Sequence, residues 1–380
     1  MSADSLRIGL NLLYLMPGAG GAGTYASELM PALLEVDPAT RLTAFVTERV
    51  PPELLSRAWA REVEWVRHAV APSSRRALVT QMVEIPLAGR RRRLDVIHSP
   101  ANIGLPATGR AANVVTALDL IWLHRWSSPL GPRERFRAKV LFTLCARAAD
   151  RVITISEATK RDLVETAKLD PGRIDVTPLA VTEQPAEPTP ERELRSRVGL
   201  DGRPFVLTVA QKQPHKNLAA TIAAVSELEG TQLVLAGAPA AHERDLRAFA
   251  ERLGVAERVR FLDWVTDSDL AALYAAAAGF VLPSFIEGFG LPVLESMRHG
   301  TPVACSNRSA LAEVAGDAVL LFDPYDQGAI TEAVRRLVRD ERLRRELAER
   351  GRRRCREFSW RQTATETLTS YRRAVEARRR

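Results

Sequence analysis

Two glutamates, Glu287 and Glu295, flank a glycine loop in the stretch EGFGLPVLE. Gly288 and Gly290 permit backbone conformations that other residues avoid, and Pro292 is well tolerated only in the first turn of a helix. The pattern therefore predicts that Glu287 lies on a loop, that Pro292 opens a helix, and that Glu295 lies about one turn inside it. The preceding run GFVLPSF is typical of a buried strand. Strand, glycine loop and helix together present backbone N–H groups to an anion.

A second candidate segment is VAQKQPHKNL, which contains Lys212 and Lys216. Only five of the 54 basic residues of the chain are lysines, so two of them in one loop are informative. We expect Lys216 to lie beside a helix that begins at Asn217, where its ammonium can pair with a phosphate as a point charge. The alternative is a solvated lysine in a turn.

A glycine-rich turn, PGAGGAGTYASEL, follows the first apolar run. Gly20 and Gly21 lie in this turn, which would let a phosphate approach the backbone. The segment contains a Gly-x-Gly-x-x-Gly pattern from Gly18 to Gly23, but no acidic residue closes the next apolar run, RLTAFVT. A dinucleotide ribose would require one, so a dehydrogenase is disfavoured. A tight turn without a ligand is the alternative.

Polar side chains also fall at expected strand ends in the first half, namely His98, Asp119 and His124, and His215 precedes Lys216. A histidine in a loop is more often a surface residue than a catalyst, so each stays a candidate. No Asp-x-Asp pair stands where a metal-bridged diphosphate would require it, and the three cysteines show no metal-ligand spacing. We therefore predict no obligatory metal.

The elements that position these residues alternate between short apolar runs and longer amphipathic segments, which is typical of parallel α/β architecture. The apolar runs that we interpret as strands are RIGLNLLYL, RLTAFVT, LDVIHSP, NVVTALD, DRVITIS and RIDVTPLA, then PFVLTVA, QLVLAG, VRFLDWV, GFVLPSF, TPVACS and AVLLFDP. Between the two groups, a proline-rich stretch of mixed charge indicates a linker at 184–200.

This alternation predicts two Rossmann-like doubly wound domains, 1–183 and 201–359, with an interdomain cleft. We expect a C-terminal helix, 360–380, to pack back on the first domain. Ligands of such sheets bind at the carboxyl ends of the strands, where the candidate residues lie.

The formal net charge of +8 and the pI near 9.8 favour a negatively charged partner. Aromatic residues make up 6% of the chain and are not interleaved with the arginine runs, so we expect no nucleic-acid partner. No apolar stretch reaches the ~18 residues that span a bilayer, and the N-terminus has no basic leader-type region, so we expect a cytoplasmic protein.

The arginine run Arg90 to Arg93 follows a segment with Leu78, Met82 and Ile85 at helical spacing, which predicts an amphipathic helix. One interpretation is a core-packing helix followed by a solvated basic turn. The other is a peripheral contact with the inner face of a membrane, to which each basic residue near an anionic surface would add ~1 kcal/mol.

Together these segments resemble family 4 of the retaining glycosyltransferases, which have the GT-B fold. The resemblance covers nearly the whole chain and rests on GGAGTYASEL, DVIHSPANIGLP, ISEATKRDL, RIDVTPLAV, PHKNL and EGFGLPVLESMRHGTPVACSN. Glu287 to Glu295 matches the family's Glu-x7-Glu signature, with the glycines and the proline in place.

The resemblance implies a retaining, metal-independent hexosyltransferase that uses a nucleoside-diphosphate sugar and no further cofactor. It implies that Glu295 holds the two ribose hydroxyls, that Glu287 contacts the transferred sugar, and that Lys216 binds the diphosphate. GDP-mannose is our first choice of donor, with UDP-glucose and UDP-N-acetylglucosamine as alternatives. We expect the acceptor to be a hydroxyl of a lipid-linked glycan or a small natural product. The remaining donor-binding residues that we expect are Gly20, Gly21, Lys212, Gly288, Phe289, Gly290 and Leu291.

The chain departs from the family pattern in two places. The family's arginine five residues before Lys216 is Gln211 here, and we expect Lys212 to supply that charge. The family's His-Asp strand end reads Leu118-Asp119, so we assign catalytic roles to Asp119 and, in place of the absent histidine, to His124. The alternatives are a catalytically silent family member that binds a nucleotide sugar, and a basic nucleic-acid or membrane scaffold protein.

Overall fold

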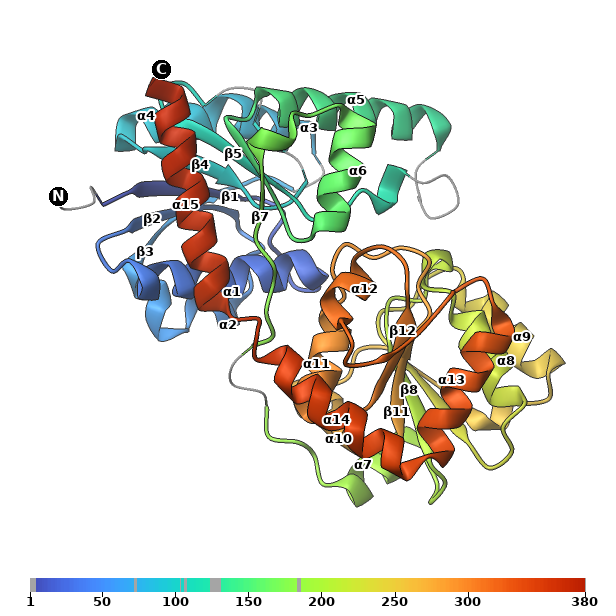
Figure 1. The fold of residues 1–380 in the computed structure, drawn as a ribbon. Coiled ribbons are helices and arrows are strands. Elements are labelled where there is room, and N and C mark those ends of the chain that lie inside the picture. Colours follow the sequence, from blue (N-terminus) through green and yellow to red (C-terminus); the bar gives the residue numbers. More distant parts are fainter. Residues whose placement is uncertain are drawn as a thin grey trace. The chain divides into compact units, whose positions relative to one another are not determined.

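The computed structural model describes residues 5–71, 74–102, 104–105, 108–123, 131–182 and 186–379. The described chain divides into two compact units, each built on its own parallel sheet (Figure 1). The first unit comprises residues 5–123, 131–179 and 359–379, and the second comprises residues 180–358.

The first unit has a seven-stranded sheet in the order β3-β2-β1-β4-β5-β6-β7, with every pair parallel. The strands are β1 (Arg7–Leu12), β2 (Arg41–Thr47), β3 (Val63–His68), β4 (Val96–Ser99), β5 (Ala112–Ala117), β6 (Arg151–Thr154) and β7 (Ile174–Val176). The helices are α1 (Gly20–Val36), α2 (Pro52–Leu55), η1 (Ala58–Glu62), α3 (Arg75–Val79), η2 (Thr80–Glu84), α4 (Ile85–Arg92), η3 (Ile121–Leu123), α5 (Pro132–Ala148), α6 (Glu157–Ala167), η4 (Pro171–Arg173) and α15 (Trp360–Arg379).

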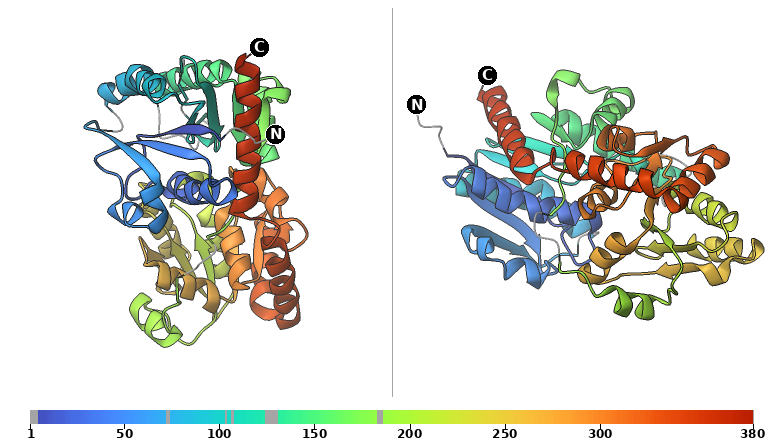
Figure 2. Two further views of the ribbon diagram at one scale, coloured as in Figure 1. Left: turned by 90° about the vertical axis from the view of Figure 1, so that its left-hand side faces the viewer. Right: turned by 60° about the horizontal axis from the view of Figure 1, so that its bottom comes forward.

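Helices cover both faces of this sheet. Successive strand residues point to opposite faces, so neighbouring residues of one strand pack against different helices. On one face, Ile97 packs with Ile85 of α4, and Val115 packs with Phe142 of α5. On the other face, their chain neighbours point toward α15, which is the dark red helix of Figures 1 and 2. The C-terminal helix is therefore an integral layer of the first unit.

The contact of α15 with the sheet is partly polar. His98 of β4 lies between Tyr371 and Thr116, with each ring nitrogen 2.7 Å from one hydroxyl oxygen. Nearer the surface, Ser370 donates to Asp175 at 2.7 Å, and Arg373 lies 2.8 Å from the same carboxylate. Because buried polar groups are costly unless they are hydrogen-bonded, these contacts fix the position of α15 along the strands.

The second unit has a six-stranded parallel sheet in the order β10-β9-β8-β11-β12-β13. The strands are β8 (Phe205–Val209), β9 (Gln232–Ala236), β10 (Val259–Leu262), β11 (Gly279–Leu282), β12 (Val303–Ser306) and β13 (Leu320–Phe322). The helices are α7 (Glu191–Val198), η5 (Pro214–Lys216), α8 (Leu218–Ser226), α9 (Glu243–Arg252), η6 (Ala256–Arg258), α10 (Asp267–Ala276), α11 (Leu291–His299), α12 (Ala310–Ala315), α13 (Gln327–Arg339) and α14 (Glu341–Cys355).

Both sheets confirm the predicted doubly wound α/β class. In each unit the chain starts in the middle, proceeds to one edge and then returns to fill the other half. The order reverses between β1 and β4 in the first unit and between β8 and β11 in the second, and such switch points are where these sheets bind ligands.

One strand, β3, was not predicted from the sequence. Its sequence, VEWVRH, interleaves charged and apolar residues, and it lies at the edge of the sheet with only Val63 fully buried. An edge strand needs no continuous apolar run, which is the signal that identified the other strands. Among the described residues, no helix combines the length and apolar character needed to cross a membrane.

Candidate functional site

Lys216 and Glu287 form an ion pair at the switch point of the second unit. Lys216 ends η5, the turn that follows β8, and Glu287 lies in the loop that follows β11. The ammonium nitrogen of Lys216 lies 2.7 Å and 2.8 Å from the two carboxylate oxygens of Glu287. The structure therefore joins two of the sequence-predicted site residues across the strands where the order reverses.

Two serines fix the carboxylate and backbone of Glu287. The hydroxyl of Ser284 donates to Oε1 of Glu287 at 2.7 Å. The backbone N–H of Glu287 donates to Oγ of Ser309 at 3.1 Å, and that hydroxyl in turn donates to the Glu287 carbonyl at 2.5 Å. Ser309 has a φ of +59°, a conformation that is uncommon for a residue other than glycine. Glu287 is therefore held in place before any ligand arrives.

The glycine loop leads directly into α11, as predicted. Gly290 precedes the helix with a φ of +108°, and a Cβ atom there would lie 2.6 Å from Leu311. The conformation favours glycine, and a Cβ atom would also have to displace the end of the Leu311 side chain. Pro292 lies in the first turn of α11, where its missing N–H costs no hydrogen bond. The remaining N–H groups and the helix dipole of this first turn favour an anion.

Phe289 differs from the other donor-binding candidates in this loop. Its side chain is 4% exposed, and its ring packs edge-on against Phe358 with a centroid separation of 5.9 Å. The side chain is thus part of the hydrophobic core, and only the backbone of Phe289 belongs to the loop surface. Leu291, the first residue of α11, is half-buried.

Glu295 lies in α11, one turn after the glycine loop. Tyr274 of α10 donates its hydroxyl hydrogen to Oε2 of Glu295 at 2.7 Å, and the Tyr274 ring stacks on His299 at 5.5 Å. Burial raises the pKa of Glu295 above its usual value, although the Tyr274 hydrogen bond acts in the opposite direction. The tyrosine engages one carboxylate oxygen, so the geometry suits a carboxylate that accepts from a diol with its other lone pairs.

His215 lies beside the ion pair in the same turn as Lys216. Its side chain is 6% exposed, and its Nδ1 atom has no hydrogen-bond partner among the described residues. Burial, together with the neighbouring ammonium of Lys216, lowers the pKa of His215 to about 4. The imidazole is therefore neutral near pH 7.

The structure contradicts the expected donor contact of Lys212. Its side chain is 0% exposed, and Nζ donates to the carbonyl oxygens of Gly237 at 2.5 Å and Leu262 at 2.8 Å. Carboxylate oxygens of Glu243 and Asp263 lie 3.4 Å and 3.5 Å from the same nitrogen. These partners account for the three N–H donors of an ammonium. Lys212 thus ties together the loops after β9 and β10 instead of supplying charge to a diphosphate.

The first unit places its candidates at the carboxyl edge of its own sheet. Gly20 and Gly21 begin α1 after β1, both are exposed, and the helix has no side-chain cap, so its first N–H groups stay open to an anion. Asp119 follows β5 and accepts from the backbone N–H of Ile121 at 3.1 Å. His124 lies outside the described residues.

His98, which we considered among the strand-end histidines, is a buried structural residue. It is 0% exposed, and burial lowers its pKa to about 3. A neutral imidazole donates from one nitrogen and accepts at the other. This matches the two hydroxyl partners, Tyr371 and Thr116. The side chain therefore joins α15 to the sheet.

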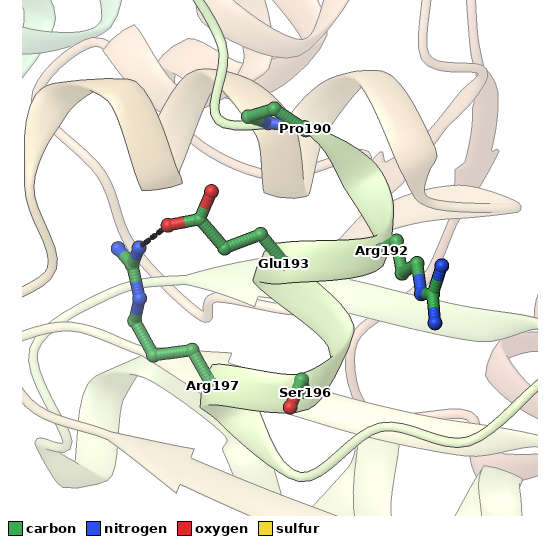
Figure 3. A pocket seen from close by; sticks show the side chains of 5 residues that line it. All are labelled: Pro190, Arg192, Glu193, Ser196 and Arg197. Carbon is green, nitrogen blue, oxygen red and sulfur yellow. Dashed lines mark hydrogen bonds and ion pairs between the residues drawn. The ribbon is translucent and has the colours of Figure 1, made fainter.

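A separate cavity of about 540 Å³ lies on α7 (Figure 3). Glu193 and Arg197 face each other there as an ion pair one helical turn apart, whereas Arg192 points away from them. None of the residues that line it belongs to the predicted site, and Arg197 also pairs with Asp269 of α10 at 2.7 Å. We therefore assign no ligand to this cavity.

Sequence reasoning missed the residues that hold the two glutamates, which are Ser284, Ser309 and Tyr274. Ser284 lies three residues before Glu287 in PSFIEGFG, a spacing that is compatible with a local side-chain contact. Ser309 and Tyr274 come from other elements, β12–α12 and α10, and no pattern in the sequence places them beside the glutamates.

Comparisons with known proteins agree with this arrangement. The chain matches the family models "Glycosyltransferase Family 4" over residues 19–184 and "Glycosyl transferases group 1" over residues 190–354. It is 33% identical over 231 residues to O-antigen chain mannosyltransferase B of Escherichia coli, a match that covers 59% of this chain and 61% of that relative. The chain thus spans less than two thirds of that relative's length.

Solved structures share the fold. A sucrose-phosphate synthase from Thermosynechococcus elongatus has a TM-score of 0.78 and 21% identity, over 97% of this chain and 98% of that chain. The Anabaena protein HepE, in complex with UDP-glucose, has a TM-score of 0.72 and 19% identity, over 96% of this chain and all of that chain (100%). With family matches over both units and the Glu-x7-Glu pair at the switch point, this chain belongs to family 4 of the glycosyltransferases and has the GT-B fold.

Proposed function

We propose that this protein transfers a hexosyl group from a nucleoside-diphosphate sugar to an acceptor hydroxyl, with retention of the anomeric configuration. The observation that carries the proposal is the Lys216–Glu287 ion pair beside the first turn of α11, at the switch point of the second sheet. A cation, a carboxylate and a helix N-terminus at one strand edge suit a diphosphate joined to a polyhydroxylated sugar.

The donor's parts are assigned to residues of the second unit. Glu295 accepts from both ribose hydroxyls, and Lys216 with the N–H groups near Gly290 binds the diphosphate. Glu287 contacts hydroxyls of the transferred sugar through its carboxylate. Since Lys216 and Glu287 already bond to each other, the phosphate must share the ammonium with the carboxylate, which a three-donor group allows.

Transfer breaks the bond between the anomeric carbon and the leaving phosphate. The negative charge that develops on that phosphate is stabilised by Lys216 and the first turn of α11, without a requirement for a metal ion. We propose front-side attack by the acceptor hydroxyl, with the leaving phosphate as its base. Asp119 stays a proposed contact in the first unit; its carboxylate already caps the turn at Ile121.

GDP-mannose is the donor that we propose first, supported by the mannosyltransferase relative; UDP-glucose is the first competitor, supported by the ligand of HepE. For the acceptor we propose a hydroxyl on a lipid-linked glycan, reached by a cytoplasmic enzyme at the inner face of the membrane. A small natural product is the alternative acceptor.

The test combines binding with turnover. Thermal unfolding is measured with GDP, UDP, GDP-mannose, UDP-glucose and UDP-N-acetylglucosamine, because ligand at 100 times its Kd stabilises by about 2.7 kcal/mol. Release of nucleoside diphosphate from the stabilising donor is then measured with and without acceptor. Stabilisation with transfer supports the proposal. Stabilisation without any transfer or hydrolysis would indicate a catalytically silent member, and no stabilisation by any nucleotide would reject the function.

A further inference from the structure

Large apolar side chains that are exposed gather on one part of the first unit. Of the twelve such residues in the described chain, eight lie on the helical segment α3–η2–α4 and on α5. They are Leu78, Val79, Met82, Val83 and Leu87 on the first segment, and Phe136, Val140 and Leu144 on the second. We call these eight side chains the outer apolar face.

The two segments present this face in the same direction. Ile85 and Phe142 point inward to the same side of the sheet, against neighbouring strands β4 and β5. Residues on the opposite sides of both helices therefore point away from the sheet together. Figures 1 and 2 show these helices side by side along one border of the first unit.

The periodicity of the first segment differs from the sequence prediction. Leu78 and Met82 are 41% and 37% exposed, as the membrane interpretation requires, but Ile85 is 0% exposed. The π-helical turn η2 contains Met82 and ends just before Ile85. Its wider turn shifts the helical spacing, so Ile85 no longer lies on the same face as Leu78 and Met82. The interpretation as a purely core-packing helix is therefore wrong for Leu78 and Met82 and right for Ile85.

Positive charge surrounds the outer apolar face. Residues 76–93 carry five arginines and one glutamate, and residues 132–148 carry four arginines, one lysine and one glutamate. Each segment thus has a net charge of +4, of which Arg92 in the first segment pairs with Glu64 of β3 at 2.9 Å. Arg90, Arg91 and Arg137 are exposed.

A basic cavity continues this surface at the end of α4. It has a volume of about 820 Å³ and is lined by Arg90, Arg93 and Arg110 together with Arg378 and Arg379 of α15. Asp95 is the one acidic side chain in its lining, and it already accepts from the backbone N–H of Arg7 at 2.9 Å. Arg378 already donates to the carbonyl of Gly109 at 2.7 Å and lies 3.4 Å from Asp150. The other arginines of the lining offer guanidinium groups to phosphate oxygens.

We propose that the outer apolar face and its basic border form a docking surface for an anionic lipid bilayer. Apolar side chains on a helix with arginines at its flanks enter the boundary between headgroups and acyl chains, while the arginines pair with phosphates. The charge complementarity selects a bilayer over an uncharged apolar partner. The proposal does not depend on the glycosyl transfer, because the surface lies within the first unit and binding is measured without substrate.

Sedimentation with vesicles tests the proposal. The full chain is mixed at low ionic strength with vesicles of phosphatidylglycerol and phosphatidylcholine, or of phosphatidylcholine alone. We expect binding to the anionic vesicles that weakens in high salt, and little binding to the neutral ones. No binding to anionic vesicles, or equal binding to both kinds, would overturn the proposal.

Matched variants locate the contact. Arg90→Ser with Arg91→Ser should weaken binding about 30-fold, from about fivefold for each arginine. Phe136→Ser with Leu144→Ser should weaken it at least about tenfold. The controls are Arg342→Ser with Arg353→Ser on α14, and Trp264→Ser, an apolar residue that is 68% exposed in the second unit. Equal weakening in the controls would overturn the assigned surface.

Two further outcomes also decide. In the first, inorganic phosphate shifts the unfolding temperature, the shift depends on Arg90 and Arg93, and no vesicle binding occurs. That result would assign the basic cavity to free phosphate and overturn the bilayer proposal. A dimer in sedimentation velocity that Phe136→Ser abolishes, again without vesicle binding, would assign the outer apolar face to a second copy of the chain.

Discussion

The switch points of the two sheets have the same topology and opposite chemistry. In the second unit, the ion pair Lys216–Glu287 occupies the strand ends and stays partly exposed, at 16% and 9% of the two side chains. In the first unit, the corresponding strand β4 contributes His98, which is neutral, 0% exposed and covered by Tyr371. Strand order therefore creates a place for a ligand, and the side chains at the strand ends decide whether charge is available there.

A similar contrast holds between the two lysines of one loop. Lys212 and Lys216 are four residues apart, yet one ammonium is enclosed by carbonyl and carboxylate oxygens and the other faces a single carboxylate. Because an ammonium has three donors, the enclosed lysine is committed to the fold and the other retains capacity for a ligand.

The largest expected effect comes from Lys216→Ala. Turnover should fall about 10²- to 10³-fold, because a preorganised group that stabilises developing charge is worth about 3–4 kcal/mol in the transition state. The measurement is kcat with the donor that stabilises the protein, together with the unfolding temperature as a control for folding. Unchanged kcat in a folded variant would show that another cation supports the leaving phosphate.

Lys212→Met is the matched variant, and it should destabilise the fold while it leaves turnover nearly unchanged. Loss of the ammonium leaves the carbonyl of Gly237 without its partner, whereas the Leu262 carbonyl keeps the N–H of Gly237 and the Glu243 carboxylate keeps Arg247. An unsatisfied buried group costs about 1–3 kcal/mol, so urea unfolding should show a loss of about 1–3 kcal/mol. The kcat of the folded fraction should stay within about twofold. A large fall in kcat without destabilisation would restore the donor-phosphate role for Lys212.

Glu295→Ala should weaken the binding of the free nucleoside diphosphate by about 10- to 100-fold, since a hydrogen bond to a charged group is worth about 1.5–3 kcal/mol. Calorimetric titration measures the affinity. Because burial raises the pKa of Glu295, protonation should also weaken binding at a pH above the usual range of a glutamate. Equal affinities of the variant and the parent chain would refute the ribose contact.

The neutral state of buried His98 predicts how the free energy of unfolding depends on pH. An unfolded histidine takes up a proton with a pKa near 6.5, whereas His98 in the folded chain does so only at about 3. The unfolded state therefore binds more protons between these values, and the free energy of unfolding should fall by about 1.4 kcal/mol per pH unit as the pH drops from about 6.

His98→Gln should remove part of this slope while it keeps one hydrogen bond. Urea unfolding at pH 7 and pH 5 gives the change in the free energy of unfolding between the two pH values. The control is His242→Gln, because His242 pairs with Asp245 at the surface. A variant with the same pH dependence as the parent chain would show that His98 does not limit acid stability.

The smallest expected effect is that of Tyr274→Phe. The substitution removes one hydrogen bond to Glu295 and leaves the ring stacked on His299. Nucleotide affinity should change by less than about tenfold, or about 1.4 kcal/mol, because the removed hydrogen bond orients the carboxylate and does not itself contact the nucleotide. A loss as large as that of Glu295→Ala would make Tyr274 essential for the orientation of the carboxylate.

The sequence predicted the elements around the site because long apolar runs and glycine-proline punctuation mark strand ends and helix starts. Those signals placed Glu287 on a loop, Pro292 in the first turn of a helix and Lys216 at a strand end, and the structure confirms these positions. They could not decide which way Lys212 points, because an irregular loop has no period from which side-chain direction follows. Ser309 and Tyr274 meet the glutamates only through tertiary packing, which local patterns do not record.

The position of α15 also bears on how the chain folds during synthesis. The first unit needs residues 360–379 to cover His98 and the strands around it, whereas the second unit is nearly continuous, from Ala180 to Phe358. A ribosome that adds about 5–20 residues per second would therefore keep the first sheet uncovered for roughly 10–40 s after β7 emerges. The fold of the first unit is thus completed last, although most of its residues are synthesised first. A nonsense mutation near the carboxyl end would expose the core of the first unit to aggregation and proteolysis.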